Sequence, residues 1–229
     1  MSKILFRLNR LKVNKILFQT ESGGSSIALE SQSSPNIDGS SENPEDWTHT
    51  IGNLTNGYII VSFSYYGGTI TSATFDGAAM TLLESHAYSV DTPQQCAIFG
   101  LAVGNKAAGT YTISVSASSG AEFNGISSAF NNVHQSISTG GATSAEGVGT
   151  DVSVTVSSAT GETVVDHVNS YSNASWTVGS NQTAIYTDTT GLTDGASSYE
   201  VGASSVIMSW TKSNAATPWI ICAVALKPS

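Results

Sequence analysis

Apolar and polar residues alternate along most of this chain from residue 27 onward, and this period of two constrains the fold more than any other feature. The alternation is clearest in four runs, at residues 58–66, 110–116, 151–157 and 205–211. Because successive side chains of a strand point to opposite faces, each run is predicted to be a strand with one buried face. Weaker runs lie at residues 26–31, 47–51, 121–130, 162–168, 183–187 and 197–202. We therefore expect an all-β fold of about twelve to fourteen strands, a two-sheet antiparallel β-sandwich that is jelly-roll-like.

Two further segments, residues 95–103 and 219–226, are apolar on both faces. A strand buried on both sides lies in the interior of a sheet, so these segments are predicted to carry Cys96 and Cys222 into the core. The two cysteines are either free thiols that pack as small apolar side chains or a disulfide, which needs an oxidising compartment. Neither alternative gives redox catalysis, because the chain has no CxxC motif.

Two dipeptides indicate tight turns between strands. Asp76-Gly77 is the stronger signal, because a type I′ hairpin needs positive φ at both central positions, which this pair tolerates. Asn56-Gly57 is a second candidate for a hairpin turn.

The first eighteen residues form a basic, apolar N-terminal arm. Residues 1–18 hold five of the eight basic residues and no acid, a formal charge of +5. Residues 19–229 hold three lysines and all seventeen acids, a formal charge of −14. Residues 19–26 (QTESGGSS) are predicted to be a flexible joint, and residues 27–229 a single β-sandwich domain. The KILF repeat at 3–6 and 15–18 suits a strand, whereas clustering of Arg7, Arg10 and Asn14 suits a helix, so both conformations remain open.

The arm is predicted to dock onto other virion or surface-assembly proteins, or onto copies of the chain itself. It carries nine apolar side chains after Met1, too many to leave in water. The alternative is that the arm completes its own sandwich. The residues expected to dock are Lys3, Phe6, Arg7, Arg10, Lys12, Lys15 and Phe18. The acidic body repels nucleic acid and anionic membranes, so neither is an expected partner.

Composition indicates an extracellular type of surface. Charged residues make up 11% of the chain, against roughly 25% in an average soluble domain. Ser, Thr, Asn and Gly cover the solvated faces instead, as is typical of secreted, adhesive and virion-surface β proteins. The apolar runs near the N-terminus are too short for a secretory signal, and no stretch is long enough for a membrane span. The expected location is the virion surface or the extracellular medium.

No arrangement of residues indicates catalysis, a metal site or a cofactor. The chain has no GxSxG elbow, and His49, His86, His134 and His167 show no ligand or triad spacing. Asp188 and Asp194 flank the loop TDTTGLTDG and are interpreted as solvated loop acids, with Ca²⁺ coordination or glycoside hydrolysis as alternatives. We therefore expect a protein that is not an enzyme.

Aromatic residues in polar, loop-rich sequence offer a second function. Trp176, Tyr186 and Tyr199 are the candidate ligand-binding residues, because exposed rings stack on the apolar face of sugars. Trp210 and Trp219 lie in apolar strands and are expected in the core.

Several blocks of the sequence resemble a widespread group of β-sandwich proteins found in phage structural regions and in secreted bacterial proteins. The blocks are WTHT, YIIVSFSYY, ITSATFDGAAMTLL, IFGLAV, GTYTISVSAS and MSWTKSNAATPWIICAVALKP, within residues 27–228. The resemblance implies a sandwich fold and carries no catalytic residue. The main hypothesis is a non-enzymatic virion structural protein (capsid decoration, head fibre or tail-associated) anchored by its arm. The alternative is a secreted or displayed carbohydrate-binding module or adhesin.

Overall fold

The structure is a computed structural model that describes residues 25–35, 43–90, 94–118, 122–136, 139–171, 174–189 and 193–229. The predicted arm, with all seven of its docking residues, lies outside the described residues. No helix occurs in these seven ranges, so the all-β prediction is confirmed there. The search for a membrane-spanning helix in the same ranges accordingly found none.

The first half of the body, residues 28–131, contains two antiparallel sheets. Its five-stranded sheet, here the first inner sheet, has the spatial order β1 (Ala28–Ser33), β9 (Glu122–Asn131), β3 (Leu54–Tyr66), β7 (Gln94–Lys106) and β6 (Thr81–Ala87). Its four-stranded sheet, the first outer sheet, has the order β2 (Glu45–Ile51), β8 (Gly109–Ala117), β4 (Ile70–Phe75) and β5 (Ala78–Ala79).

The second half, residues 139–226, is built in the same way. The second inner sheet has the order β10 (Thr139–Val148), β17 (Pro218–Leu226), β12 (Thr163–Tyr171), β15 (Thr193–Val201) and β14 (Thr183–Asp188). The second outer sheet has the order β11 (Asp151–Ser157), β16 (Ser205–Lys212) and β13 (Trp176–Val178).

The two halves share one connectivity. In each inner sheet the first and last strands of the half are neighbours, and the last strand also pairs with the long strand β3 or β12. In each outer sheet the strand before the last, β8 or β16, lies between its two partners. This alternation of the chain between two sheets is the jelly-roll arrangement. The predicted antiparallel sandwich is confirmed, and the chain contains it twice, as four sheets instead of two.

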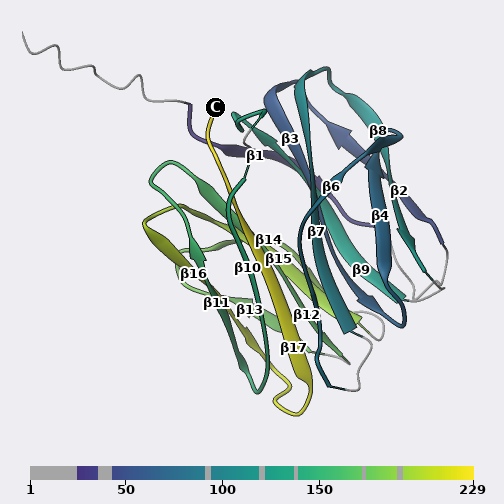
Figure 1. Ribbon diagram of the computed structural model, residues 1–229, viewed down its shortest axis with the longest axis vertical. Helices are drawn as coiled ribbons and strands as arrows, with labels where there is room; N and C mark the ends of the chain where they lie inside the picture. The colour runs from purple at the N-terminus through teal and green to yellow at the C-terminus, as the bar shows by residue number, and fades with distance from the viewer. Residues whose placement is uncertain are drawn as a thin grey trace, which may run out of the picture.

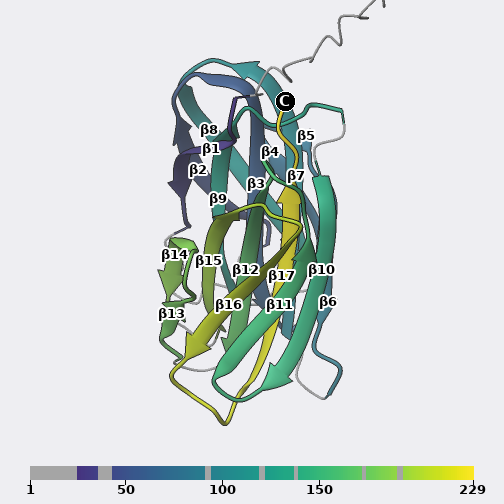
Figure 2. The same ribbon diagram turned by 90° about the vertical axis from the view of Figure 1, so that its left-hand side faces the viewer.

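The two inner sheets face each other, which gives four layers (Figures 1 and 2). Strand β3 contacts β12 and β15, β7 contacts β12 and β17, and β9 contacts β15. Exchanging equivalent strands (β3 with β12, β7 with β15, β9 with β17) reproduces these contacts, whereas the contacts of β6 with β10 and β17 have no counterpart of similar extent between β14 and β1 or β9. The two-fold relation between the halves is therefore incomplete, and we call the space between the inner sheets the central interface.

Three apolar clusters fill the spaces between the four layers. The first half is closed around Phe63, Phe75 and Ile113, and the second around Val154, Met208 and Trp210. The central interface is filled by Tyr58, Ile60, Cys96, Ile98, Ile126, Phe130, Val133, Val165, Ile185, Ile220, Cys222, Val224 and Leu226. Each inner sheet is therefore covered on one face by its outer sheet and on the other face by the opposite inner sheet.

This double coverage corrects one prediction from the sequence. Residues 58–66 are predicted to bury a single face, but β3 buries both, including Ser62 and Ser64 on the central interface. The remaining three alternating runs form β8, β11 and β16 of the outer sheets, and these do bury one face. The two segments apolar on both faces form β7 and β17, which lie inside their sheets as predicted.

One of the two predicted hairpin turns is present. Asp76 and Gly77 have φ of 52° and 76° and connect β4 to β5, which confirms the turn of type I′ character. The prediction for Asn56-Gly57 is wrong, because both residues lie within β3 at a shift of its register with β7. Asn56 has φ of 45° there, so the pair forms a bulge instead of a turn.

Candidate functional site

Three facing pairs of small or polar residues form a row across the central interface, which we call the interface row. The pairs are His86 with Ser144, Cys96 with Cys222, and Ser64 with His167, the first of each pair on the first inner sheet. Cys96 is the middle residue on its sheet, because β7 lies between β6 and β3. Cys222 is the middle residue on the other sheet, because β17 lies between β10 and β12. The strand registers thus align the six residues.

The Ser64–His167 end of the row is fully buried. The Ser64 hydroxyl lies 2.7 Å from His167 Nε2, and the Ser197 hydroxyl lies 2.7 Å from His167 Nδ1. Burial lowers the pKa of His167 to about 3, so the imidazole is neutral near pH 7. A neutral imidazole has one donor and one acceptor, and the two hydroxyls satisfy both.

The two cysteines in the middle of the row are free thiols. Cys96 Sγ donates to the carbonyl oxygen of His167 at 3.3 Å, and Cys222 Sγ donates to the carbonyl oxygen of Cys96 at 3.5 Å. Burial and the neighbouring Cys96 raise the pKa of the Cys222 thiol. The Cys222 thiol therefore stays protonated inside the folded protein.

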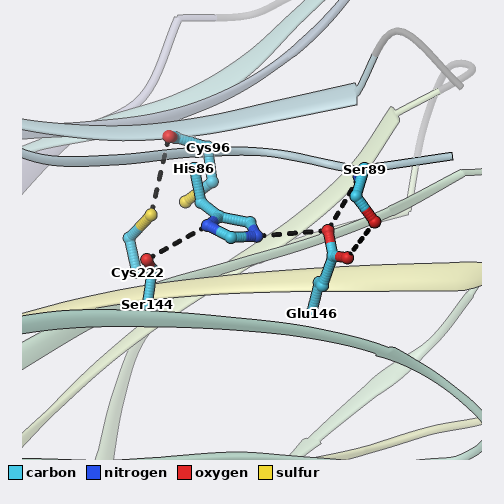
Figure 3. A network of polar contacts seen from close by, with 6 residues as sticks. All are labelled: His86, Ser89, Cys96, Ser144, Glu146 and Cys222. Carbon is cyan, nitrogen blue, oxygen red and sulfur yellow. Dashed lines mark hydrogen bonds and ion pairs between the residues drawn. The ribbon is translucent and has the colours of Figure 1, made fainter.

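The His86–Ser144 end of the row, whose contacts are drawn in Figure 3, is partly exposed to solvent. His86 Nδ1 lies 3.2 Å from the Ser144 hydroxyl, and His86 Nε2 lies 3.1 Å from Glu146 Oε2. Ser89 donates its backbone N–H to Glu146 Oε2 at 2.9 Å and its hydroxyl to Glu146 Oε1. These bonds, the Ser89 hydroxyl first, lower the pKa of Glu146. The side chains of His86 and Glu146 are 30% and 26% exposed.

The hydrogen bonds at this end of the row join the two halves. Ser144, His86 and Glu146 follow the order hydroxyl, imidazole, carboxylate, as the residues of a nucleophilic triad do. A catalytic triad also needs hydrogen-bond donors placed for an oxyanion. Here Ser144 and Glu146 lie two residues apart on one strand, and His86 and Ser89 contact them from β6 and the segment after it. Every bond of the cluster thus joins the first half to the second.

Strands β6 and β10 of the two halves lie side by side along a line that we call the seam. Beyond the interface row, a groove of about 450 Å³ lies along this seam. It lies at the Thr81 end of β6 and the Thr139 end of β10, and Tyr58, Leu83 and Leu101 contribute its larger apolar side chains. A second groove, of about 370 Å³, lies along β16 of the second outer sheet and extends to Glu200 on β15 of the second inner sheet. It is lined by Ser180, Asn181, Glu200, Ser205, Val206, Ile207 and Ser209.

A buried carboxylate lies outside the interface row, between the two sheets of the second half. Asp166 on β12 accepts hydrogen bonds from Trp210 Nε1 at 2.7 Å and from the N–H and hydroxyl of Ser198 at 2.7 and 2.8 Å. Burial raises the pKa of Asp166 to about 7, although these donors act in the opposite direction. The contact with Trp210 ties the inner sheet to the outer sheet.

The same half encloses a lysine and a second aspartate. Lys212 is fully buried and donates to the hydroxyls of Ser170 at 3.0 Å and Thr217 at 2.8 Å. Burial lowers the pKa of Lys212 to about 8 and raises that of Asp194 to about 6. The interpretation of Asp194 as a solvated loop acid is wrong, because it lies on β15, is fully buried and accepts from the Ala174 N–H.

The three aromatic residues predicted to bind a ligand do not form an exposed surface. Trp176 is 8% exposed and packs edge-on against Trp210 in the second core, with ring centroids 6.4 Å apart. Tyr186 and Tyr199 pack against the apolar cluster of the central interface. The Tyr186 hydroxyl lies 2.9 Å from Asn124 Oδ1, and Tyr199 packs against Phe130. Trp210 and Trp219 are buried, as predicted.

Sequence reasoning identifies His86 and His167 without finding partners for them, because their partners lie on strands far along the chain.

Within the described ranges, no group of three or more His, Cys, Asp or Glu side chains is placed to hold a metal ion. Comparison of the chain with protein-family models, with curated proteins and with solved structures found no match. The resemblance to phage-associated and secreted sandwich proteins therefore stays a prediction.

Proposed function

We propose that this protein is a non-enzymatic structural protein of a virion, attached to its particle through residues 1–18. A capsid decoration, head-fibre or tail-associated protein fits this role. The observation that carries the proposal is the separation of charge, +5 on residues 1–18 against −14 on residues 19–229. Two of the three lysines of the body are already engaged, since Lys212 is buried and Lys106 lies 3.4 Å from Asp76. Opposite charges of this kind favour docking of the arm onto an adjacent acidic copy.

The position of the chain ends in the body supports attachment at one end. The Asn132 side chain donates to the carbonyl oxygen of Ser26 at 2.9 Å, and the Ser229 N–H donates to the carbonyl oxygen of Asn132 at 2.9 Å. The described body thus begins and ends beside one residue, close to β1 (Figure 1). A partner held through the arm would leave the opposite end of the four-layer body projecting outward.

The fold agrees with this proposal by analogy alone. Jelly rolls are common in viral capsid proteins and in lectins, so the architecture fits both candidate functions. Fold does not decide between them, because function depends on particular sites.

Deleting residues 1–20 tests the proposal. The truncated chain is expected to stay soluble, to melt near the parent temperature and to lose self-association or attachment to its particle, as measured by light scattering. In the full chain, added salt should weaken association, because it screens the charge pairs. The double variant Arg7→Gln/Arg10→Gln should reproduce the loss, whereas Lys227→Gln in the body should not. A truncated chain that aggregates or fails to fold would show that the arm belongs to the core.

Carbohydrate binding remains the second candidate, supported by the groove along β16. Hydroxyl, amide and carboxylate groups surround Ile207, which is 61% exposed and offers an apolar contact for a sugar ring. Glu200→Gln and Ile207→Ala should each remove binding on a glycan array without changing the melting temperature. A parent protein without any glycan signal would eliminate this candidate and leave the structural role.

A further inference from the structure

The facing cysteines have no part in the proposed attachment, and they join strands of different halves. Cys96 lies on β7 and Cys222 on β17, and each is 0% exposed. They are 126 residues apart along the chain. The sequence leaves open whether they are free or bonded, and their geometry bears directly on that question.

The two inner sheets approach closely at the cysteine pair. Cys96 Sγ reaches the carbonyl oxygen of His167 on the opposite sheet at 3.3 Å. Cys222 Sγ reaches the carbonyl oxygen of Cys96 itself at 3.5 Å. Each thiol therefore already touches the backbone of the facing sheet, and Figure 3 shows both sulfur atoms in the space between the two strands.

Hydrogen-bonded pairs on both sides hold this approach in place. Ser64 and His167 lie on one side with 2.7 Å between their polar atoms, and His86 and Ser144 lie on the other with 3.2 Å. The neighbouring strands are therefore held at side-chain contact distance on both sides of the cysteine pair. Large backbone movement is the usual obstacle to a disulfide, and the contact of each thiol with the facing sheet limits the movement that the bond would need.

We propose that Cys96 and Cys222 form a disulfide across the central interface when the chain folds in the presence of a small-molecule disulfide such as oxidised glutathione. The thiolate of one cysteine attacks a sulfur of oxidised glutathione, forms a mixed disulfide and releases one glutathione thiolate. The thiolate of the second cysteine attacks the protein sulfur of the mixed disulfide and releases the second glutathione. The two protein thiols are oxidised, oxidised glutathione is reduced, and the two protons pass to the glutathione thiolates.

The mixed disulfide forms before the central interface closes, and the second exchange follows as the inner sheets dock. Inside the folded protein both sulfurs are inaccessible, and burial raises the pKa of the Cys222 thiol, which suppresses the attacking thiolate. During folding both thiols are exposed to the oxidant, and docking of the inner sheets brings them together. The product would lock the two jelly rolls to each other, which suits a protein that must survive outside a cell.

Refolding with and without oxidant tests the proposal. The full chain is unfolded in urea, refolded in a buffer of oxidised and reduced glutathione, then alkylated in denaturant and analysed by mass spectrometry. We expect a monomer that has lost two hydrogens and yields a linked peptide pair containing Cys96 and Cys222. Its Tm should rise by on the order of 10 °C over the reduced protein, because the bond closes a long loop.

Two controls separate the bond from other effects of oxidation. Cys222→Ser should yield no intramolecular link, and Cys96→Ala/Cys222→Ala should melt at one temperature with and without oxidant. Alkylation of both thiols in the refolded parent would overturn the proposal, as would a linked protein that melts below the reduced one. Should refolding from urea fail, the chain can be exported to an oxidising bacterial periplasm and its mass measured in the same way. A linked pair then supports the proposal, and two alkylated thiols overturn it.

Discussion

Asp166 shows how much one buried group can make stability depend on pH. Its folded pKa of about 7 lies above the value of about 3.9 in an unfolded chain. Between these two values the folded state binds the proton and the unfolded state does not. The contribution of this group is therefore fully present below about pH 4, is lost as the pH rises toward 7, and changes little above that.

We predict that Asp166→Asn removes this pH dependence. Asparagine keeps the shape of the side chain and does not titrate, so any cost of its altered hydrogen bonds is constant with pH. We compare the free energies of unfolding of the parent and the variant. The parent's value minus the variant's should fall by on the order of a few kcal/mol between about pH 4 and 7. Urea unfolding across that range measures the difference. A flat difference would mean that Asp166 is ionised throughout.

Asp166→Ala is the companion variant. It leaves Trp210 Nε1 and the Ser198 N–H buried without their acceptor, which should cost on the order of 3 kcal/mol relative to Asp166→Asn at any pH, because neither variant titrates at this position.

The sequence contains a signal for Asp166 but not for its partners. A carboxylate inside the apolar run VVDHV is expected to need buried donors. Trp210, however, lies 44 residues further along the chain, and Ser198 lies 32 residues further. These partners come together only because β12 pairs with β15 and packs under β16, which alternation alone does not specify.

At the scale of elements, the interface row contains a facing serine–histidine pair at each of its two ends, in different surroundings. Ser64 and His167 meet in full burial, whereas Ser144 and His86 meet at the solvent-exposed seam. Both pairs join a serine of one half to a histidine of the other. They differ mainly in access to water, so they form a matched comparison.

We predict that Ser64→Ala destabilises the protein by about 1–3 kcal/mol, because His167 Nε2 is left buried without a partner. Ser144→Ala should cost no more than about 0.5–1 kcal/mol, because water replaces the lost hydroxyl and exposed polar pairs contribute little. Urea unfolding of both variants provides the measurement. Equal losses would indicate that the seam is as dry as the buried end.

Strands with branched or aromatic residues can be predicted from the sequence, and strands made of small residues cannot. The runs that form β8, β11 and β16 alternate clearly. Strand β10 has the sequence TGGATSAEGV, which shows no alternation, yet it forms an edge of the second inner sheet through its ladder with β17. The serines of β3 suggest a solvated face, because nothing in that segment reveals that a second sheet covers it.

At the scale of the whole molecule, the two jelly rolls are joined by the apolar faces that the inner sheets turn toward each other. Ile60, Ile98 and Ile220 are each at most 1% exposed in the central interface. Each such side chain contributes roughly 1.5–3 kcal/mol when it is buried. Separation would expose two contiguous apolar patches, which soluble monomers avoid. The duplication itself is not visible as a sequence repeat, because equivalent strands share pattern and connectivity without sharing sequence.

We predict that neither half is a stable monomer alone. Residues 25–136 and 137–229, expressed separately, should aggregate or self-associate through the uncovered inner sheet, as measured by size-exclusion chromatography with light scattering. Co-expressed, they should form a one-to-one complex with the β-rich circular dichroism of the intact body, and the intact body should unfold in a single transition. Ile98→Asp in the first fragment should prevent the complex, because it buries an unpaired carboxylate in the interface. Two monomeric fragments that each melt cooperatively would instead show that the jelly rolls are independent domains and that the central interface is a contact between them.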